Sequence, residues 1–204
     1  MIPLHDDNPT RVTPFLTIAF IGACVMVFLY QVSLPPRTGQ AFVFSFGAIP
    51  AVVFGAASLP PDLATIPPAM ILVTSMFLHG GWMHLIGNML YLWIFGNNIE
   101  DVMGHGRFIV FYFLCGIIAA LAHAMTDPSS EIPMVGASGA ISGILGAYLL
   151  LFPRAEVLVL FPIFFFIRIM YVPAGLVLGM WFLLQLLSGS ASLGRGGGGV
   201  AFFA

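Results

Sequence analysis

The chain has 204 residues, of which 60% are hydrophobic and only 7% are charged, and its mean hydropathy is +1.05. So little polar surface cannot cover a water-soluble globule, which predicts an integral membrane protein. The formal net charge of −2 provides no basic surface, so we expect no nucleic-acid partner.

Taken in chain order, the apolar runs predict an all-α fold, a polytopic transmembrane helical bundle in a single domain. Residues 1–14 are polar and are expected to form a cytoplasmic N-terminus. Residues 33–69 are too broken by proline for a span and predict an interfacial loop with short helices around 42–54. Each remaining apolar run is long enough to cross a bilayer at about 1.5 Å per residue. These runs are 15–32, 71–99, 108–125, 135–152 and 164–187.

The orientation of the bundle follows from its connections and its arginines. Short connections make consecutive spans antiparallel neighbours. With the N-terminus in the cytoplasm, Arg11, Arg107, Arg154 and Arg168 fall inside and the other two arginines fall outside, in agreement with the positive-inside rule. This topology, without an Arg- and Ser-rich leader, favours a multi-pass protein of a bacterial inner membrane.

Two groups of polar and small residues lie within the apolar runs. The second and fourth predicted spans run in the same direction, so their N-terminal halves share a depth and their side chains can converge on one pocket. Residues four apart also share a helical face. The groups are His79, His84 and Asn88 in the second predicted span, and Gly136, Ser138 and Gly139 at the start of the fourth.

Spacing alone leaves more than one role open for these residues. They can hold the bundle together through interhelical hydrogen bonds and small-residue packing, or they can form a catalytic site. A metal site is disfavoured, because the two histidines are five residues apart and no third ligand with suitable spacing is visible. We therefore expect no metal and no cofactor.

The His-x4-His-x3-Asn cluster followed by Gly-x-Ser-Gly resembles the rhomboid family of intramembrane serine proteases, over most of the chain. The resemblance implies a six-helix core and a Ser/His dyad that hydrolyses peptide bonds of transmembrane protein substrates within the lipid bilayer. By this resemblance Ser138 is the nucleophile, while His84 and Asn88 donate hydrogen bonds to the oxyanion. His79 matches a nearby structural histidine.

Other positions take supporting roles in that interpretation. Gly136 and Gly139 clear space for the substrate backbone beside the nucleophile. Glu100 falls where the family often carries an acid at a helix end that braces the bundle. Gly143 and Gly146 are expected to serve helix packing alone.

The general base of the dyad is not present in this chain according to the same resemblance. The family supplies it as a histidine at the start of the sixth span, after a Gly/Ala-rich approach, and residues 188–204 match that approach. We therefore expect a C-terminally truncated chain, with five complete spans and low or absent activity of its own. His123, late in the third predicted span, is a weaker candidate for the base.

The predicted function is that of an intramembrane serine endopeptidase, with an inactive rhomboid-like protein that binds the transmembrane helices of clients as the alternative. The joint presence of Ser138, His84 and Asn88 favours the protease, because a pure binding module has no need of oxyanion donors. A transporter or channel subunit is disfavoured by the lack of acids or arginines along a continuous buried path.

Overall fold

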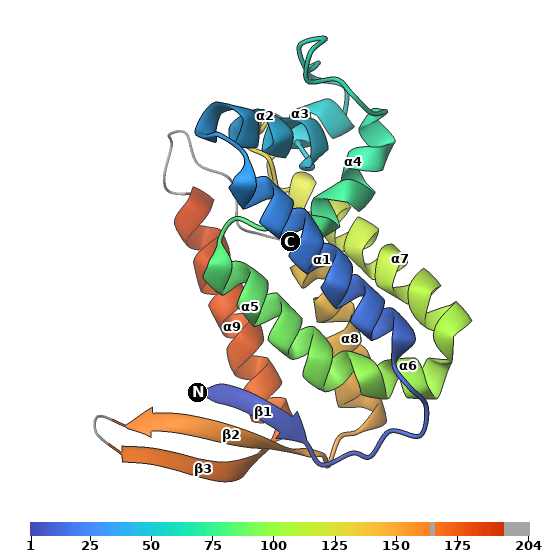
Figure 1. Cartoon of the computed structure of the whole chain (residues 1–204), viewed down its shortest axis with the longest axis vertical. Helices are drawn as coiled ribbons and strands as arrows, with labels where there is room; N and C mark the ends of the chain where they lie inside the picture. Colours follow the sequence, from blue (N-terminus) through green and yellow to red (C-terminus); the bar gives the residue numbers. More distant parts are fainter. Residues whose placement is uncertain (164–165, 194–204) are drawn as a thin grey trace.

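Apolar helices form the body of the protein, whose computed structural model describes residues 1–163 and 166–193. Figure 1 shows short helices at one end of this body and a small sheet at the other. The helices of the body are α1 (Phe15–Ser33), α5 (Trp82–Tyr91), α6 (Asn97–Met103), α7 (His105–Ala124), α8 (Ser138–Leu151) and α9 (Ala174–Leu193). The short helices are α2 (Pro36–Phe46), α3 (Pro50–Val53) and α4 (Pro68–Thr74).

Two of these helices, α1 and α7, are each long and apolar enough to cross a membrane. They coincide with the first and third predicted spans, and α8 lies where the fourth is predicted. Within the described residues the number of candidate spans rises to three when one bent helix pair is counted as a single span. A helical membrane protein is therefore supported, whereas the five-span count stays a prediction.

The second predicted span, 71–99, is not one continuous helix. Residues Pro68–Phe77 and Trp82–Met103 form two arms that are bent by 84° at the break between them. The break contains Gly80 and Gly81, and glycine is the poorest helix former after proline. The first arm ends in a 3-10 turn, and the second passes from α5 through the π-helical turn Leu92–Gly96 into α6. His79 consequently lies in the break rather than on a helix.

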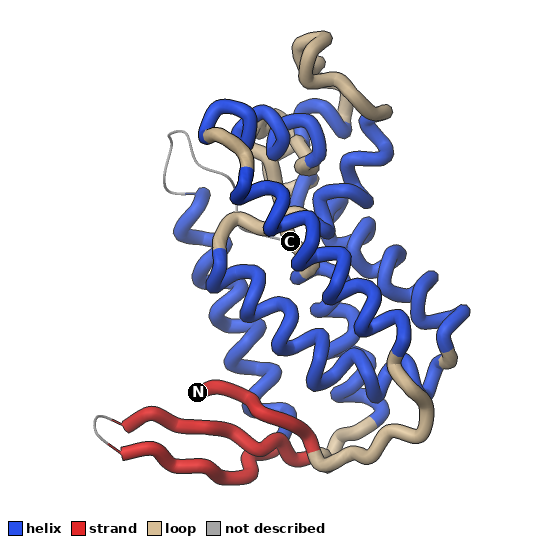
Figure 2. The backbone as a smooth tube through the Cα atoms, in the orientation of Figure 1, coloured by secondary structure: helices blue, strands red, loops and turns tan. Residues whose placement is uncertain are grey.

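The prediction of an all-α fold is wrong at the end of the body where α1 begins. Strands β1 (Ile2–Asp6), β2 (Glu156–Ile163) and β3 (Phe166–Pro173) form an antiparallel sheet in the order β1-β2-β3. Figure 2 shows this sheet lying across the ends of the helices. Part of the predicted cytoplasmic N-terminus is thus a strand paired with a segment more than 140 residues away.

The fifth predicted span, 164–187, is also corrected, because its first part belongs to β3. Valine, isoleucine and aromatic residues dominate β2 and β3, and these residue types favour strands. A helix through 164–187 would have Pro173 in its interior, which costs about 3 kcal/mol or more. Instead β3 ends at Pro173 and α9 begins at Ala174. Of the predicted approach to a sixth span, residues 194–204 lie outside the described residues.

Short helices α2 and α3 occupy the predicted interfacial loop and fix the segment that leads into α8. The Ala48 N–H donates to Met134 O at 3.0 Å, and the Met134 N–H donates back to Ala48 O at 2.8 Å. Beside this bridge, Val43, Leu78 and Val135 form a buried apolar cluster. The segment that leads into α8 is therefore held by the backbone pair with Ala48 and by the apolar cluster around Val135. The depth of α2 and α3 in the membrane stays a prediction.

Helices α7 and α8 pack closely through a small residue. A Cβ added to Gly143 of α8 would lie 2.3 Å from Sγ of Cys115 in α7, so no side chain fits there. This contact confirms the packing role expected of Gly143. Gly146 has nothing within 4 Å of an added Cβ and makes no comparable contact.

Candidate active site

Ser138 is the first residue of α8 and is fully buried. Two residues before it, Gly136 has a φ of +134°, a conformation that residues with a side chain rarely adopt. The Gly136 N–H donates to the carbonyl oxygen of Ser75 at 2.9 Å. The tight turn into α8 is thus fastened to the first arm of the bent helix pair, and it fixes where the hydroxyl of Ser138 lies.

The imidazole of His84 lies directly against this turn. A Cβ added to Gly136 would be 2.8 Å from Cε1 and 2.9 Å from Nε2 of His84, and 3.7 Å from Oγ of Ser138. The ring and the hydroxyl therefore both border the space that the missing side chain of Gly136 leaves. The structure brings together these two predicted site residues, which are 54 positions apart in the chain.

The hydrogen bonding of His84 assigns a role to each of its ring nitrogens. The Gly80 N–H donates to Nδ1 of His84 at 3.4 Å, so Nδ1 acts as the acceptor. In a neutral imidazole the other nitrogen then carries the proton. Nε2, the nitrogen nearest Gly136, is accordingly a donor on the side of the ring that faces the turn into α8.

His79 supports this arrangement from within the break. Its ring meets that of His84 edge to face, with the centroids 5.2 Å apart, and its Nδ1 lies 3.3 Å from the carbonyl oxygen of Phe77. The backbone of His79 is held by Gln31 of α1, whose Nε2 donates to His79 O at 2.8 Å and whose Oε1 accepts from His79 N at 3.4 Å. Sequence reasoning missed Gln31, although a polar amide late in an apolar run was a signal for it.

Asn88 lies one turn beyond His84 on the same helix, and α5 contacts α8. Its side chain is 3% exposed, and its Nδ2 has no hydrogen-bond partner among the described residues. A buried donor left in this state costs about 1–3 kcal/mol. Such a cost is typical of a group that is kept for a ligand or a reaction rather than for stability.

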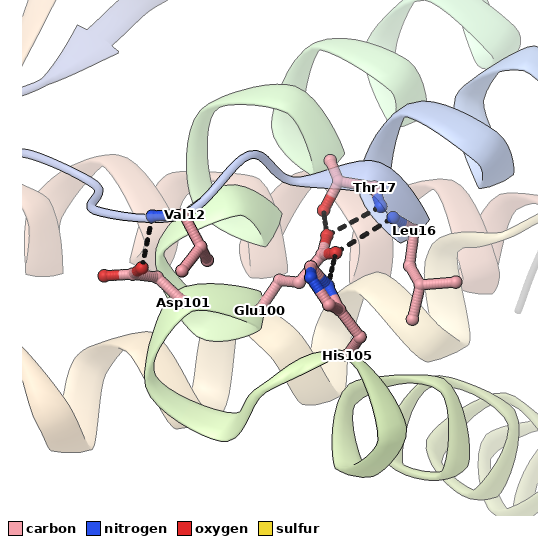
Figure 3. A network of polar contacts seen from close by, with 6 residues as sticks. All are labelled: Val12, Leu16, Thr17, Glu100, Asp101 and His105. Carbon is pink, nitrogen blue, oxygen red and sulfur yellow. Dashed lines mark hydrogen bonds and ion pairs between the residues drawn. The ribbon is translucent and has the colours of Figure 1, made fainter.

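Glu100, in α6 at the far end of the second arm, braces that arm against α1, as the resemblance implied. Its carboxylate accepts hydrogen bonds from Leu16 N at 2.9 Å, Thr17 N at 2.8 Å and Thr17 Oγ1 at 2.7 Å (Figure 3). Nδ1 of His105 lies 2.6 Å from the same carboxylate. The first N–H groups of a helix have no partner within it, and here Glu100 satisfies two of those of α1.

Together these elements bring hydrogen-bond donors to the start of α8. A helix N-terminus presents backbone N–H groups and a partial positive charge. Nε2 of His84 adds a donor beside the same turn. In chemical terms the arrangement can stabilise negative charge that develops on an oxygen next to Ser138. Within residues 1–163 and 166–193, no three side chains of His, Cys, Asp or Glu gather in a way that could hold a metal ion.

The remaining predicted site residues are placed as follows. Gly139 is buried in the first turn of α8, directly after Ser138. His123 lies near the end of α7, where its carbonyl oxygen accepts hydrogen bonds from Thr126. Its use as a base stays a prediction, and the expected position of the family's catalytic histidine lies beyond the described residues.

The fold and this site define a class of protein, namely a helical membrane protein with a buried serine at a helix N-terminus beside a His/Asn face. The model of the Rhomboid domain family matches residues 68–204, which is more than half of the chain. The chain belongs to the rhomboid family.

Individual relatives agree with this membership. Rhomboid protease GluP of Bacillus subtilis is 44% identical over 78 residues, which cover 38% of this chain and 15% of that protein. RHOMBOID-like protein 5 of Arabidopsis thaliana is 40% identical over 78 residues, or 38% of this chain and 25% of that protein. The mitochondrial Rhomboid protein 1 of Saccharomyces cerevisiae is 28% identical over 177 residues, or 74% of this chain and 51% of that protein.

These alignments cover only part of each relative and do not decide the cellular compartment of this protein. The chain spans about half or less of the length of these curated relatives. Their names include mitochondrial proteins, and a further match is a chloroplastic one. A membrane protein is therefore established by family and by composition, whereas a bacterial inner membrane stays a prediction.

Proposed function

We propose that the protein is an intramembrane serine endopeptidase that cleaves transmembrane segments of its substrates. The observation that carries the proposal is that His84 and Ser138 meet at Gly136. The position that a Cβ of Gly136 would take lies 2.9 Å from the imidazole Nε2 and 3.7 Å from the serine Oγ. Support also comes from relatives named as proteases, such as Rhomboid protease GluP.

In this proposal Ser138 is the nucleophile. Its Oγ attacks the carbonyl carbon of the scissile peptide bond, and its proton passes to a histidine base that is not among the 204 residues of this chain. The carbonyl oxygen becomes an oxyanion, and the proton is then delivered to the leaving amine as the acyl-enzyme forms. Water subsequently hydrolyses the acyl-enzyme and regenerates the serine.

The oxyanion is stabilised by donors that are already in place before the reaction. Nε2 of His84 and Nδ2 of Asn88 supply two, and backbone N–H groups at the start of α8 supply the rest. Asn88 contributes because its amide is buried without a partner in the described part of the chain. Removal of one such donor typically lowers kcat by about 10²–10³-fold.

The test uses the protein at its native locus, with a substrate whose transmembrane segment lies between two reporter domains. We expect Ser138→Ala to abolish cleavage and Asn88→Ala to lower it by about 10²–10³-fold. Ser142→Ala is the matched control, since it removes a hydroxyl one turn along the same helix, where Oγ donates to Ser138 O at 2.7 Å. That variant is expected to retain most of the activity.

Cleavage that persists unchanged in Ser138→Ala would contradict the proposed nucleophile. Stable capture of the substrate without cleavage, equal in the wild type and in Ser138→Ala, would instead identify the client-binding alternative. Comparable losses in Ser138→Ala and Ser142→Ala, accompanied by lower protein levels, would mark a folding defect and would also contradict the specific role of Ser138.

A further inference from the structure

The hairpin formed by β2 and β3 runs past the helices to one side of the body (Figures 1 and 2). Side chains alternate between the two faces of a strand. On one face of β3, Ile167 is 69% exposed and Ile169 is 56% exposed, followed by Tyr171. On the opposite face, Met170 is 51% exposed. The projecting part of the hairpin thus exposes an apolar row on one face, and on the other face it exposes Met170 beside Arg168.

Close to α9 the same sheet is buried. Val157 and Val159 of β2 and Val172 of β3 are buried, and both strands contact the base of α9. Met170, which pairs with the buried Val159, lies on the outer strand of the sheet and is exposed. The hairpin is thus anchored at its base, while its outer strand exposes large apolar side chains in the described part of the chain.

Charge is almost absent from this region. Arg168 is the only charged residue between Glu156 and Arg195 in the sequence, and it pairs with Phe161 across the hairpin. Arginine can bury its apolar stem while its guanidinium reaches phosphate or water. Tyrosine, represented here by Tyr171, is enriched at membrane–water interfaces.

The position of the hairpin relative to the bilayer follows from α9. The helix begins at Ala174, directly after β3, and it exposes apolar side chains that include Leu176, Leu183 and Leu184. In a membrane protein such an exposed apolar face is turned to lipid tails. Because no residue separates β3 from α9, the hairpin lies where this lipid-facing surface ends.

We propose that the β2–β3 hairpin is a monotopic arm that lies in the headgroup region of the bilayer. A protein partner or a second copy of this chain would cover one face of the hairpin, whereas immersion in the interface covers both. The exposed surface of the arm is continuous with the lipid-facing surface of α9, and this continuity identifies the bilayer as its occupant.

The sheet order limits the depth of the arm. Among residues 1–163 and 166–193, β3 is an edge strand, so its outer backbone N–H and C=O groups have no strand partner there. In hydrocarbon each unsatisfied group would cost several kcal/mol, so an open edge cannot enter the core of the bilayer. The arm therefore lies shallow, about 5–10 Å into the headgroup and acyl boundary, where water and headgroups still reach the edge.

The test measures the depth of a fluorescent label attached at Ile167→Cys. The protein is placed in vesicles of phosphatidylcholine and phosphatidylglycerol, with Cys24 and Cys115 replaced by alanine. Quenching by lipids with a doxyl group near the headgroup is compared with quenching by lipids with a doxyl group near the chain end. Leu114→Cys, in the middle of α7, provides the deep reference, and Thr10→Cys, in the exposed polar connection between β1 and α1, provides the aqueous one.

We expect the label at Ile167→Cys to lose more fluorescence with the headgroup quencher than with the chain-end quencher, and the reverse at Leu114→Cys. Values equal to those of Thr10→Cys would overturn the proposal and leave a protein partner or a second copy as the occupant. Quenching as deep as at Leu114→Cys would also overturn it, because the segment would then cross the bilayer. If the alanine background is unstable, the label is placed in the protein that retains Cys24, which is fully buried.

Discussion

Gly136→Ala is the most direct test of the contact between His84 and the turn before Ser138. Alanine at a φ of +134° is strained, which typically costs about 1–3 kcal/mol. Its methyl group would also meet the His84 ring at 2.8–2.9 Å, and overpacking of this kind costs about 1–3 kcal/mol. We therefore expect the free energy of unfolding to fall by about 2–6 kcal/mol.

The ring cannot move aside without breaking other contacts. Its Nδ1 accepts from the Gly80 N–H, and its edge meets the ring of His79, which Gln31 holds in turn. A shift of His84 would also move Nε2 away from Ser138. The proposed protease should thus lose activity in Gly136→Ala even at temperatures where the variant remains folded.

Unfolding is measured on purified protein in mixed micelles by titration with a denaturing detergent, with tryptophan fluorescence as the readout. Gly146→Ala is the matched control, because it lies in α8 and an added Cβ meets nothing within 4 Å. This control should be neutral or stabilising by up to about 1 kcal/mol, since alanine is the better helix former. If Gly136→Ala changes the unfolding free energy by less than about 0.5 kcal/mol, the close approach of His84 is refuted.

Two further substitutions test the contacts that hold α1 against the bent helix pair. Glu100→Gln places an amide N–H among groups that are themselves hydrogen-bond donors. We therefore expect the free energy of unfolding to fall by about 2–5 kcal/mol in the same assay. Asp101→Asn changes a half-buried carboxylate that accepts an exposed hydrogen bond from the Val12 N–H, and it should lower the unfolding free energy by less than about 1 kcal/mol; equal losses would contradict the brace. Gln31→Ala removes the clamp on the backbone of His79 and should cost about 1–3 kcal/mol, with faster amide hydrogen exchange around the break. Unchanged exchange there would show that Gln31 does not hold the break.

The first and third predicted spans, which became α1 and α7, could be predicted from the sequence because a membrane span is a local property. A run such as 15–32 is apolar throughout, and its transfer into lipid depends little on what packs beside it. The helix α1 accordingly begins at Phe15 and ends at Ser33, within one residue of the prediction. The spacing of His84 and Asn88 also fixes their shared helical face, because both lie within α5.

The second and fifth predicted spans are not single continuous helices, and the reason is different. Hydropathy does not distinguish a bent helix pair from a straight one, nor an apolar strand from an apolar helix. The signals that separate them were present as the pair Gly80 and Gly81 and as Pro173. β1 carried even less signal, because a short strand is stabilised mainly by the strand it pairs with.

The sequence by itself determined that this is a membrane protein with a rhomboid-like serine, histidine and asparagine pattern, since composition and short-range spacing are written along one chain. Only the tertiary structure decided that His84 lies against Gly136, that Gln31 holds the break, and that the segment before α9 is a hairpin. Each of these features is a contact between segments far apart in the sequence. Whether such a contact forms depends on packing, steric fit and hydrogen-bond geometry across the whole bundle, and no local pattern encodes these.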